Sequence, residues 1–284
     1  MTYRRDLFTG TPLSESGDRA DPVPKGRVYL ALALLIPLFT FSVAACADAS
    51  RAKPAPVRAR AHAPDAKVSG SPAPDRASGA YRTKEVYVAE LGTSLSVFPS
   101  VFAPHRVNQP FRQFLLAADL SWAKEVLEVG TGSGVLSFII LRRGAGQVVA
   151  TDVNEVAIRN ATSNAERLGY GGRFEARLVP LDHPEAFAVI APSERFDLIV
   201  SNPPWYDGTP RTMKERAVYD EGYGLLRSLL GGLRNHLKPG GRAWLEYSGY
   251  AARAVIAQEA PRYALAQRTL LENGSYATIE LRER

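Results

Sequence analysis

The pattern of apolar and polar positions divides the chain into four stretches. Residues 1–24 are polar and show no period, whereas residues 25–46 are dominated by an apolar run. Residues 47–80 are rich in alanine and proline, and residues 81–284 alternate short apolar runs with helical patterns. We therefore expect one folded domain over residues 81–284, preceded by a polar tail, an apolar segment and a flexible linker.

Strand patterns and helix patterns take turns within the expected domain. Runs typical of buried strands occupy residues 125–129, 147–152, 173–179, 196–200 and 242–247. Helical spacing predicts helices over residues 108–120, 133–143, 154–168 and 226–237. Asn108 is the expected cap of the first helix, with Pro110 in its first turn. This alternation predicts parallel strands joined by crossovers, in an open, doubly wound α/β sheet.

The C-terminal stretch departs from this rhythm. Residues 268–272 and 275–281 both have strand patterns, and they flank Asn273-Gly274, the strongest short-range signal for a hairpin. The expected fold class is therefore α/β, with a doubly wound, mostly parallel seven-stranded sheet that ends in an antiparallel hairpin.

The charge of the chain lies mainly outside the expected domain. The whole chain has a formal net charge of +6. The first 80 residues hold 11 basic and 7 acidic side chains, whereas the remaining 204 hold 24 and 22. A domain this close to neutrality lacks the basic surface that is typical of nucleic-acid-binding proteins.

Cysteine and histidine usage gives no sign of a metal centre. Cys46 is the only cysteine, so the chain forms neither an intramolecular disulfide nor a thiolate-rich metal site. The four histidines are far apart in the sequence and show no ligand spacing. We therefore predict no metal site.

The apolar segment has two features that bear on localisation. Residues 28–47 are twenty residues without a charge, long enough to span a bilayer as a helix. They end in Val43-Ala44-Ala45-Cys46, which resembles the lipobox of bacterial lipoproteins, where the signal is cut before a cysteine that carries lipid. The alternatives are an uncleaved anchor with a free thiol and a misassigned start codon. We expect membrane attachment through residues 28–46.

The charges around this segment do not favour either side of the membrane. Five basic residues precede it and four follow it closely, which is no asymmetry for the positive-inside rule. Residues 47–80 contain 11 alanines and 5 prolines, a composition typical of an extended tether. The expectation is a membrane-tethered domain on an undetermined side, with a cytoplasmic domain as the alternative.

A glycine-rich loop, Glu128-Val129-Gly130-Thr131-Gly132-Ser133-Gly134, follows the first parallel strand. Glycine lets a strand turn sharply into a helix and lets a ligand approach bare backbone. A dinucleotide fingerprint needs its third glycine at the position of Val135, and the lysine of a phosphate loop is absent. Asp152 ends the next strand, where a carboxylate is able to accept both hydroxyls of a ribose.

This combination resembles the class I S-adenosylmethionine-dependent methyltransferases, which have an acid, alternate glycines and a second acid after the next strand. The resemblance implies S-adenosylmethionine as the cofactor. The glycines would face its methionine and ribose portions, Asp152 would hold the ribose, and residues after it would contact the adenine. The residues implied are Glu128, Gly130, Thr131, Gly132, Gly134, Asp152, Val153, Asn154 and Asp182. The alternative is a dinucleotide-binding or purely structural turn.

Asn202-Pro203-Pro204-Trp205 follows the fourth strand, at the same edge of the sheet. It resembles the Asn/Asp-Pro-Pro-aromatic motif of amino-directed methyltransferases, so these four are the candidate catalytic residues. A planar amide or base amine has a delocalised lone pair, so its nitrogen must be held in line with the methyl group. The Asn202 side-chain oxygen and the Pro203 carbonyl are able to accept its N–H groups, and Trp205 offers a face for stacking. The alternative is a proline-rich turn with a core tryptophan.

Two classes of acceptor fit this motif. The chain resembles the release-factor glutamine methyltransferases, although Trp205-Tyr206-Asp207 departs from their usual tyrosine and Ile-Pro. Residues 220–224 roughly match their Glu-x-Gly segment, and residues 97–104 resemble the entry to the small-domain methyltransferases. The near-neutral charge of the domain favours a protein glutamine over a base amine of RNA or DNA. The short stretch before the glycine loop favours the same acceptor, because it has room only for a lid or a strand pair.

A cofactor-binding or membrane-tethered scaffold without turnover is the non-enzymatic alternative. The sequence indicates no oligomeric state. Four aromatic residues are further candidates for an acceptor pocket, although core packing explains most of them: Tyr219, Tyr223, Trp244 and Tyr247.

Overall fold

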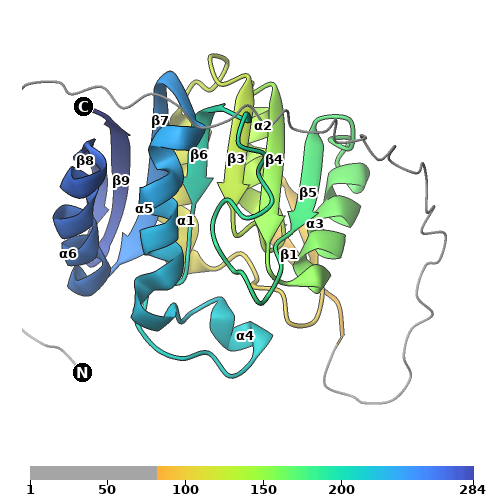
Figure 1. The fold of residues 1–284 in the computed structure, drawn as a ribbon. Helices are drawn as coiled ribbons and strands as arrows, with labels where there is room; N and C mark the ends of the chain where they lie inside the picture. The colour runs from red at the N-terminus through yellow and green to blue at the C-terminus, as the bar shows by residue number, and fades with distance from the viewer. Residues whose placement is uncertain (1–81) are drawn as a thin grey trace, which may run out of the picture. The chain divides into compact units, whose positions relative to one another are not determined.

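The structure is a computed structural model that describes residues 82–284, drawn in colour in Figure 1. The polar tail, the apolar segment with Cys46 and the alanine- and proline-rich linker lie outside the described residues. Within residues 82–284, no helix is both long enough and apolar enough to cross a membrane. The description that follows is that of the C-terminal domain.

Seven strands form one sheet, in the order β5-β4-β3-β6-β7-β9-β8. They are β3 (Glu125–Val129), β4 (Gln147–Asp152), β5 (Phe174–Leu178), β6 (Phe196–Ser201), β7 (Leu237–Ser248), β8 (Leu265–Asn273) and β9 (Tyr276–Glu283). The strands β3 to β7 run parallel, and β9 pairs antiparallel with both β7 and β8. The expected doubly wound, mostly parallel seven-stranded sheet with a C-terminal hairpin is confirmed.

Helices cover both faces of the sheet (Figure 1). They are α1 (Gln109–Ala117), α2 (Val135–Arg142), α3 (Glu155–Arg167), α4 (Met213–Arg216), α5 (Gly224–His236) and α6 (Tyr250–Glu259), with 3-10 turns at Arg106–Asn108, Glu221–Tyr223 and Ala260–Tyr263. Buried side chains of α1, α2 and α3 form a core on one face, and those of α5 and α6 form a second core on the other. Strands β4 and β6 are buried along most of their length because both faces are covered.

The first helix begins as predicted and ends earlier than predicted. It ends at Ala117 rather than near Leu120, because Ala118 leaves the helical region with ψ at 142°. Asn108 occupies the cap position, but its side chain makes no capping hydrogen bond within the described part of the chain. The predicted cap position of Asn108 and the proline in the first turn are therefore confirmed, but the cap acts without a side-chain hydrogen bond.

The C-terminal strands also depart from the predicted boundaries. β7 begins at Leu237 rather than at residue 242, and a register shift against β6 accommodates the extra residues. The hairpin turn is formed by Gly274 and Ser275, because Asn273 still pairs with Tyr276. The glycine takes the positive φ of 61° that the turn requires.

Three elements were not predicted in detail. The pair β1 (Lys84–Val88) and β2 (Thr93–Val97) forms a separate antiparallel hairpin, which is the strand pair that the N-terminal length allowed. The short helix α4 lies in the loop after β6. The helix α6 buries only Ala252 and Ile256 among its apolar residues, so its sequence shows little of a helical stripe.

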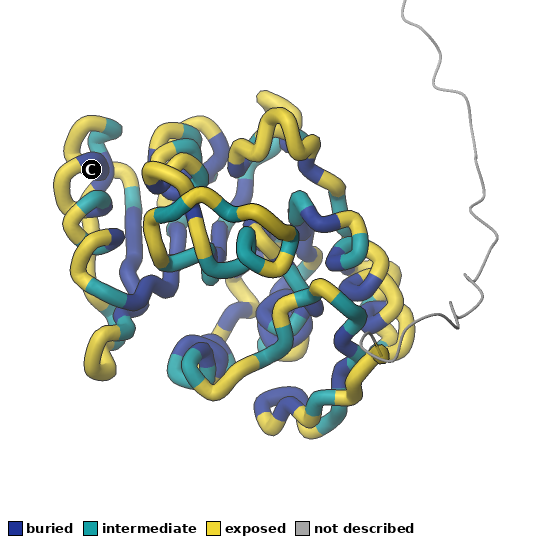
Figure 2. The backbone as a smooth tube through the Cα atoms, turned by 90° about the horizontal axis from the view of Figure 1, so that it is seen from below, coloured by how far each residue is buried: buried dark blue, intermediate teal, exposed yellow. Residues whose placement is uncertain are grey.

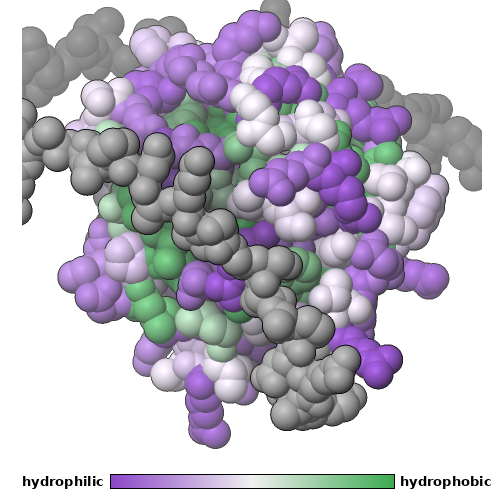
Figure 3. Space-filling model, turned by 90° about the vertical axis from the view of Figure 1, so that its right-hand side faces the viewer, coloured by the Kyte–Doolittle hydropathy of each residue, from purple (hydrophilic) through white to green (hydrophobic). Residues whose placement is uncertain are grey.

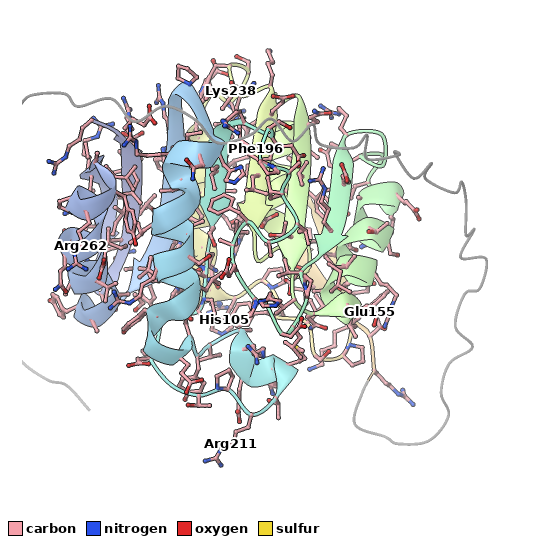
Figure 4. All side chains as sticks on the ribbon, viewed as in Figure 1. His105, Glu155, Phe196, Arg211, Lys238 and Arg262 are labelled. Atoms are coloured by element: carbon pink, nitrogen blue, oxygen red, sulfur yellow. The ribbon has the colours of Figure 1, made fainter. Side chains whose placement is uncertain are left out.

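The parallel strands end at the lower side of Figure 1, and this carboxyl edge carries the candidate site. Figure 2 looks onto this edge from below, where exposed and half-buried loops lie around the buried strands. In Figure 4, His105 and Arg211 lie on this side, whereas Phe196 and Lys238 lie on the opposite side, where β6 and β7 begin. The loops after β3, β4 and β6 therefore meet at one edge.

The sheet has an exposed margin at β5. This strand is the last in the sheet, and Leu178 at its end is 45% exposed. Figure 3 shows that side of the molecule, where patches of apolar surface lie between polar side chains. The candidate site lies on the adjacent lower side, so this margin does not form part of it.

Candidate active site

The glycine loop presents bare backbone at two positions. Gly130 and Gly132 have φ of 79° and 54°, in the left-handed region that disfavours other residues. A Cβ on Gly130 would meet no described atom within 4 Å, and one on Gly132 would meet only the Phe102 carbonyl oxygen, at 3.7 Å. This open space beside the end of β3 fits a cofactor that lies against the loop, as the sequence predicted.

Gly134 has a packing role besides the predicted one. Its φ is 86°, and a Cβ there would lie 2.4 Å from Cζ of Phe138. That distance is far inside van der Waals contact, so any side chain would displace the phenyl ring. Gly134 is therefore required by the packing of α2 against the loop, in addition to its predicted place facing the cofactor.

Glu128 holds the loop from inside the protein. Its carboxyl is buried, and Oε2 accepts hydrogen bonds from Thr131 Oγ1 at 2.9 Å, from the Ser137 backbone N–H at 3.2 Å and from the Ser137 hydroxyl. Burial raises the pKa of Glu128 to about 7, against the opposing effect of these hydrogen bonds. Glu128 and Thr131 were predicted as cofactor residues. Their side chains bond to each other and, through Glu128, to Ser137, so they hold the loop in shape from the core side.

Asp152 connects the glycine loop to the end of β4. Its Oδ2 accepts the Gly132 backbone N–H at 2.9 Å, and its Oδ1 accepts the Asn154 backbone N–H at 2.8 Å. Burial raises the pKa of this carboxyl, and the backbone hydrogen bonds oppose that rise. Each carboxylate oxygen has a further lone pair, so the group is still able to accept ribose hydroxyls.

The residues after Asp152 contribute unequally. Asn154 is buried, its Oδ1 accepts the Val156 N–H at 3.0 Å as the cap of α3, and its Nδ2 donates to the Ser100 carbonyl at 3.2 Å. Its side chain therefore fastens two segments together, and its place beside the adenine stays a prediction. Val153 is half-buried at the edge, and Asp182 is exposed in the loop after β5.

The Asn-Pro-Pro-Trp turn is organised by its own tryptophan. The Trp205 indole Nε1–H donates to Asn202 Oδ1 at 3.0 Å. The half-buried ring also packs edge-to-face against Tyr276, with centroids 5.3 Å apart. Pro203 is buried and Pro204 half-buried, which stiffens the turn. Trp205 thus orients Asn202 in addition to any stacking face that it offers.

The loop after this turn folds back and braces it. The backbone N–H groups of Trp205 and Tyr206 both donate to the Val218 carbonyl at 3.2 Å, and Asp220 N–H donates to Tyr206 O at 2.9 Å. The Asp220 carboxylate in turn accepts from the Leu225 N–H at 2.9 Å, at the start of α5. The segment that roughly matched a Glu-x-Gly motif therefore caps a helix and supports the turn.

The four aromatic candidates for an acceptor pocket separate into two groups. Tyr223, Trp244 and Tyr247 are buried in the two cores, which confirms packing as their role. Tyr219 is 40% exposed and lies beside Tyr206, with ring centroids 6.4 Å apart. Only Tyr219 is available at the surface of the site.

Two asparagines of α3 dock the segment that crosses the carboxyl edge. Asn160 Oδ1 accepts the Phe98 N–H at 2.9 Å, and its Nδ2 donates to the Ser96 carbonyl at 2.8 Å. Asn164 Nδ2 donates to the same carbonyl at 2.9 Å. Sequence reasoning missed both residues, although two asparagines spaced by four on a face of alanines are a signal that polar partners lie opposite.

Comparison with known proteins agrees with this geometry. The family model for ribosomal protein L11 methyltransferase (PrmA) matches residues 114–203. A release factor glutamine methyltransferase of Bordetella pertussis is 33% identical over 199 residues, which cover 63% of this chain and 70% of that protein. The chain belongs to the release factor glutamine methyltransferase family. It is a class I methyltransferase, and S-adenosylmethionine is its cofactor.

Two RNA methyltransferases are also similar to parts of this chain. A tRNA1(Val) (adenine(37)-N6)-methyltransferase of a Flavobacteriaceae bacterium is 36% identical over 94 residues, covering 33% of this chain and 38% of that protein. The T. thermophilus 16S rRNA N2 G1207 methyltransferase (RsmC), solved with AdoMet and guanosine, has a TM-score of 0.51 at 21% identity. That comparison covers 72% of this chain and 51% of RsmC, and it shows a shared fold.

Proposed function

We propose that this enzyme methylates the side-chain amide nitrogen of a glutamine in a protein, namely a translation release factor. The observation that carries the proposal is the turn of Asn202 to Trp205, at the end of β6. Strand β6 pairs directly with β3, which carries the glycine loop, so the turn lies next to the cofactor cradle. The similarity to a relative named for glutamine methylation supports the same acceptor.

The residues of the turn suit an amide nitrogen. S-adenosylmethionine supplies a methyl group that its sulfonium has already activated, so the protein's task is to hold and orient the acceptor. Asn202 Oδ1 has a second lone pair beside the one used by Trp205, and the Pro203 carbonyl supplies another acceptor. Two acceptors on the N–H groups align the nitrogen and favour the charge that develops as it gains the methyl group and loses a proton.

The charge around the turn favours a protein over a nucleic acid. Residues 202–223, which form the turn and the loop that braces it, carry four acidic and three basic side chains. A surface that binds long nucleic acids needs an excess of lysine and arginine to replace the counterions of the phosphates. This loop has no such excess.

A base amine of RNA is the second candidate acceptor. Two observations favour it: the similarity to a tRNA adenine methyltransferase, and the exposed rings of Tyr206 and Tyr219 beside the turn. Aromatic rings at the surface are able to stack on unpaired bases. One assay, with protein and RNA acceptors tested in parallel, separates the two candidates.

The assay transfers a tritiated methyl group to purified release factor and, in parallel, to total tRNA and ribosomal RNA. The proposal expects label in the release factor, on a glutamine that mass spectrometry locates, and no label when that glutamine is replaced. The Asn202→Ala variant should bind the cofactor and lose transfer. Label found in RNA alone would replace the proposal with the second candidate.

A further inference from the structure

Four charged or polar side chains are buried together beside the candidate site without a full set of hydrogen bonds. Glu90, Asn108, Arg112 and Glu246 are 5%, 4%, 6% and 1% exposed. Within residues 82–284, five buried atoms of this cluster lack a well-formed hydrogen bond: Glu90 Oε1, Asn108 Oδ1 and Nδ2, Arg112 Nε and Glu246 Oε2. Folded proteins satisfy nearly all buried polar groups, so groups left free beside an active site point to a ligand that satisfies them.

The position of this cluster follows from the strand register. Ser201 of β6 pairs with Leu245 of β7, so the next residues, Asn202 and Glu246, lie at the same level of adjacent strands. Asn108 is the N-cap residue of α1 at the same edge, and its side chain lies within hydrogen-bonding reach of the Glu246 carboxyl, whose pKa this contact lowers. The unsatisfied groups therefore lie beside Asn202.

Glu246 is the charged member of the cluster that forms no ion pair in the described residues. Arg112 Nε lies 3.4 Å from Glu90 Oε2, and its Nη1 donates to the His105 carbonyl at 2.9 Å. The charge of Arg112 is thus matched by Glu90. Burial raises the pKa of Glu246 to about 8, although Asn108 and Arg112 act to lower it. At neutral pH the Glu246 carboxyl mostly carries its proton and is a hydrogen-bond donor.

The acceptor amide needs such a donor. Its nitrogen carries two N–H groups, for which Asn202 Oδ1 and the Pro203 carbonyl are acceptors, but its carbonyl oxygen requires a donor that the turn does not supply. We propose that Glu246 and Asn108 form the subsite that binds the carbonyl oxygen of the acceptor amide. The inference rests on the proposed function, because it takes the acceptor to be an amide.

The subsite is tested by replacing its members with leucine in the full chain. Glu246→Leu and Asn108→Leu should each lower kcat/KM for the release factor at least 30-fold, mainly through KM. The dissociation constant for S-adenosylmethionine, measured by calorimetry, should stay within threefold. Glu246→Gln, which keeps a donor, should retain at least a third of kcat/KM. Unchanged kcat/KM in the leucine variants would overturn the proposal.

Thermal unfolding of the free protein provides a test that does not require the release factor. Apart from their contact with each other, Glu246 and Asn108 have no well-formed side-chain hydrogen bond in the described residues, so leucine at either position should leave the melting temperature unchanged or raise it. The matched control is Glu259→Leu, because Glu259 is also buried but pairs with Arg227 and Arg262. That variant should melt several degrees lower and keep its kcat/KM.

The two readouts separate failure of the subsite from failure of the proposed function. If the wild-type enzyme does not methylate the release factor, the proposed function fails and the subsite for its amide fails with it; if the wild type does so and the leucine variants keep their kcat/KM, the subsite alone is wrong. If Glu246→Leu and Asn108→Leu melt as low as Glu259→Leu, both groups serve the fold and the proposal is wrong. Unchanged or raised melting temperatures, together with the expected fall in kcat/KM, support the subsite.

Discussion

The indole N–H of Trp205 donates a 3.0 Å hydrogen bond to the side-chain oxygen of Asn202, three residues before it. An indole nitrogen only donates, so this bond determines which end of the Asn202 amide lies here. The ring itself is held by its edge-to-face contact with Tyr276. Asn202 is therefore oriented by the folded protein before any acceptor binds, which is the preorganisation that catalysis of this kind requires.

Removal of this bond should slow the reaction without affecting the cofactor. Trp205→Phe keeps an aromatic ring but loses the N–H, and we expect kcat to fall about tenfold, which corresponds to about 1.4 kcal/mol. The dissociation constant for S-adenosylmethionine should not change. Tyr276→Phe keeps the ring that packs against Trp205 and serves as the control. Full kcat in Trp205→Phe would show that the bond has no role in orienting Asn202.

The raised pKa of Glu128 predicts a pH dependence of stability. Its carboxyl has a pKa of about 7 in the folded protein, against an ordinary value of 4.5, so the folded state binds the proton more tightly. The resulting contribution is fully present below pH 4.5 and is lost as the pH rises through 7, by about 3 kcal/mol at most. Denaturant unfolding of the wild type and of Glu128→Gln should give free energies whose difference falls between pH 5 and 8. Parallel curves would contradict the assignment.

Asn160 should control the order of the segment that crosses the site. Asn160→Ala leaves the Phe98 N–H without its side-chain partner and the Ser96 carbonyl with Asn164 alone, and we expect a loss of about 1–3 kcal/mol in the free energy of unfolding. Hydrogen exchange at the Phe98 amide should accelerate more than exchange in β4. Equal acceleration at both places would mean that the asparagine stabilises the whole domain rather than this segment.

Periodicity predicted the parallel sheet well because both of its faces are covered. A strand such as Gln147–Asp152 needs apolar side chains on both sides, and that requirement is local in the sequence. The glycines were recognised for a similar reason, since positive φ at Gly130 and Gly132 is a property of single residues. Boundaries were less accurate where tertiary pairing decides, as at Leu237, where a register shift against β6 extends β7.

The direction of the polar side chains in the site could not be predicted in the same way. Glu128 and Thr131 point into the core because Ser137, on the following helix, supplies the donors. Asn108 and Glu246 are distant in the sequence and come together only when α1 packs near the end of β7. The one sign of this pairing in the local sequence is Glu246, a glutamate inside an otherwise apolar stretch of strand.

A membrane attachment through residues 28–46 predicts the behaviour of the full chain on fractionation. The full chain should sediment with membranes, whereas a variant that lacks residues 1–80 should remain in the supernatant and bind S-adenosylmethionine with the same affinity. Cys46→Ser separates the two forms of attachment, because it abolishes lipidation but leaves an apolar anchor intact. A full chain found entirely in the supernatant after gentle lysis would rule out the tether.

Gly130 and Gly134 have similar backbone angles and different surroundings, so alanine should affect them differently. Gly134→Ala places a methyl group 2.4 Å from the Phe138 ring, and we expect a loss of about 3 kcal/mol in the free energy of unfolding. Gly130→Ala meets open space, so the free energy of unfolding should fall by only about 1–2 kcal/mol, because of the positive φ alone. The affinity for S-adenosylmethionine should fall further in Gly130→Ala than in Gly134→Ala. Calorimetry with S-adenosylmethionine and denaturant unfolding measure the two effects separately. Adding Phe138→Leu should restore part of the stability to Gly134→Ala and none to Gly130→Ala. Equal losses of cofactor affinity in both alanine variants would mean that Gly134 also lines the cofactor site.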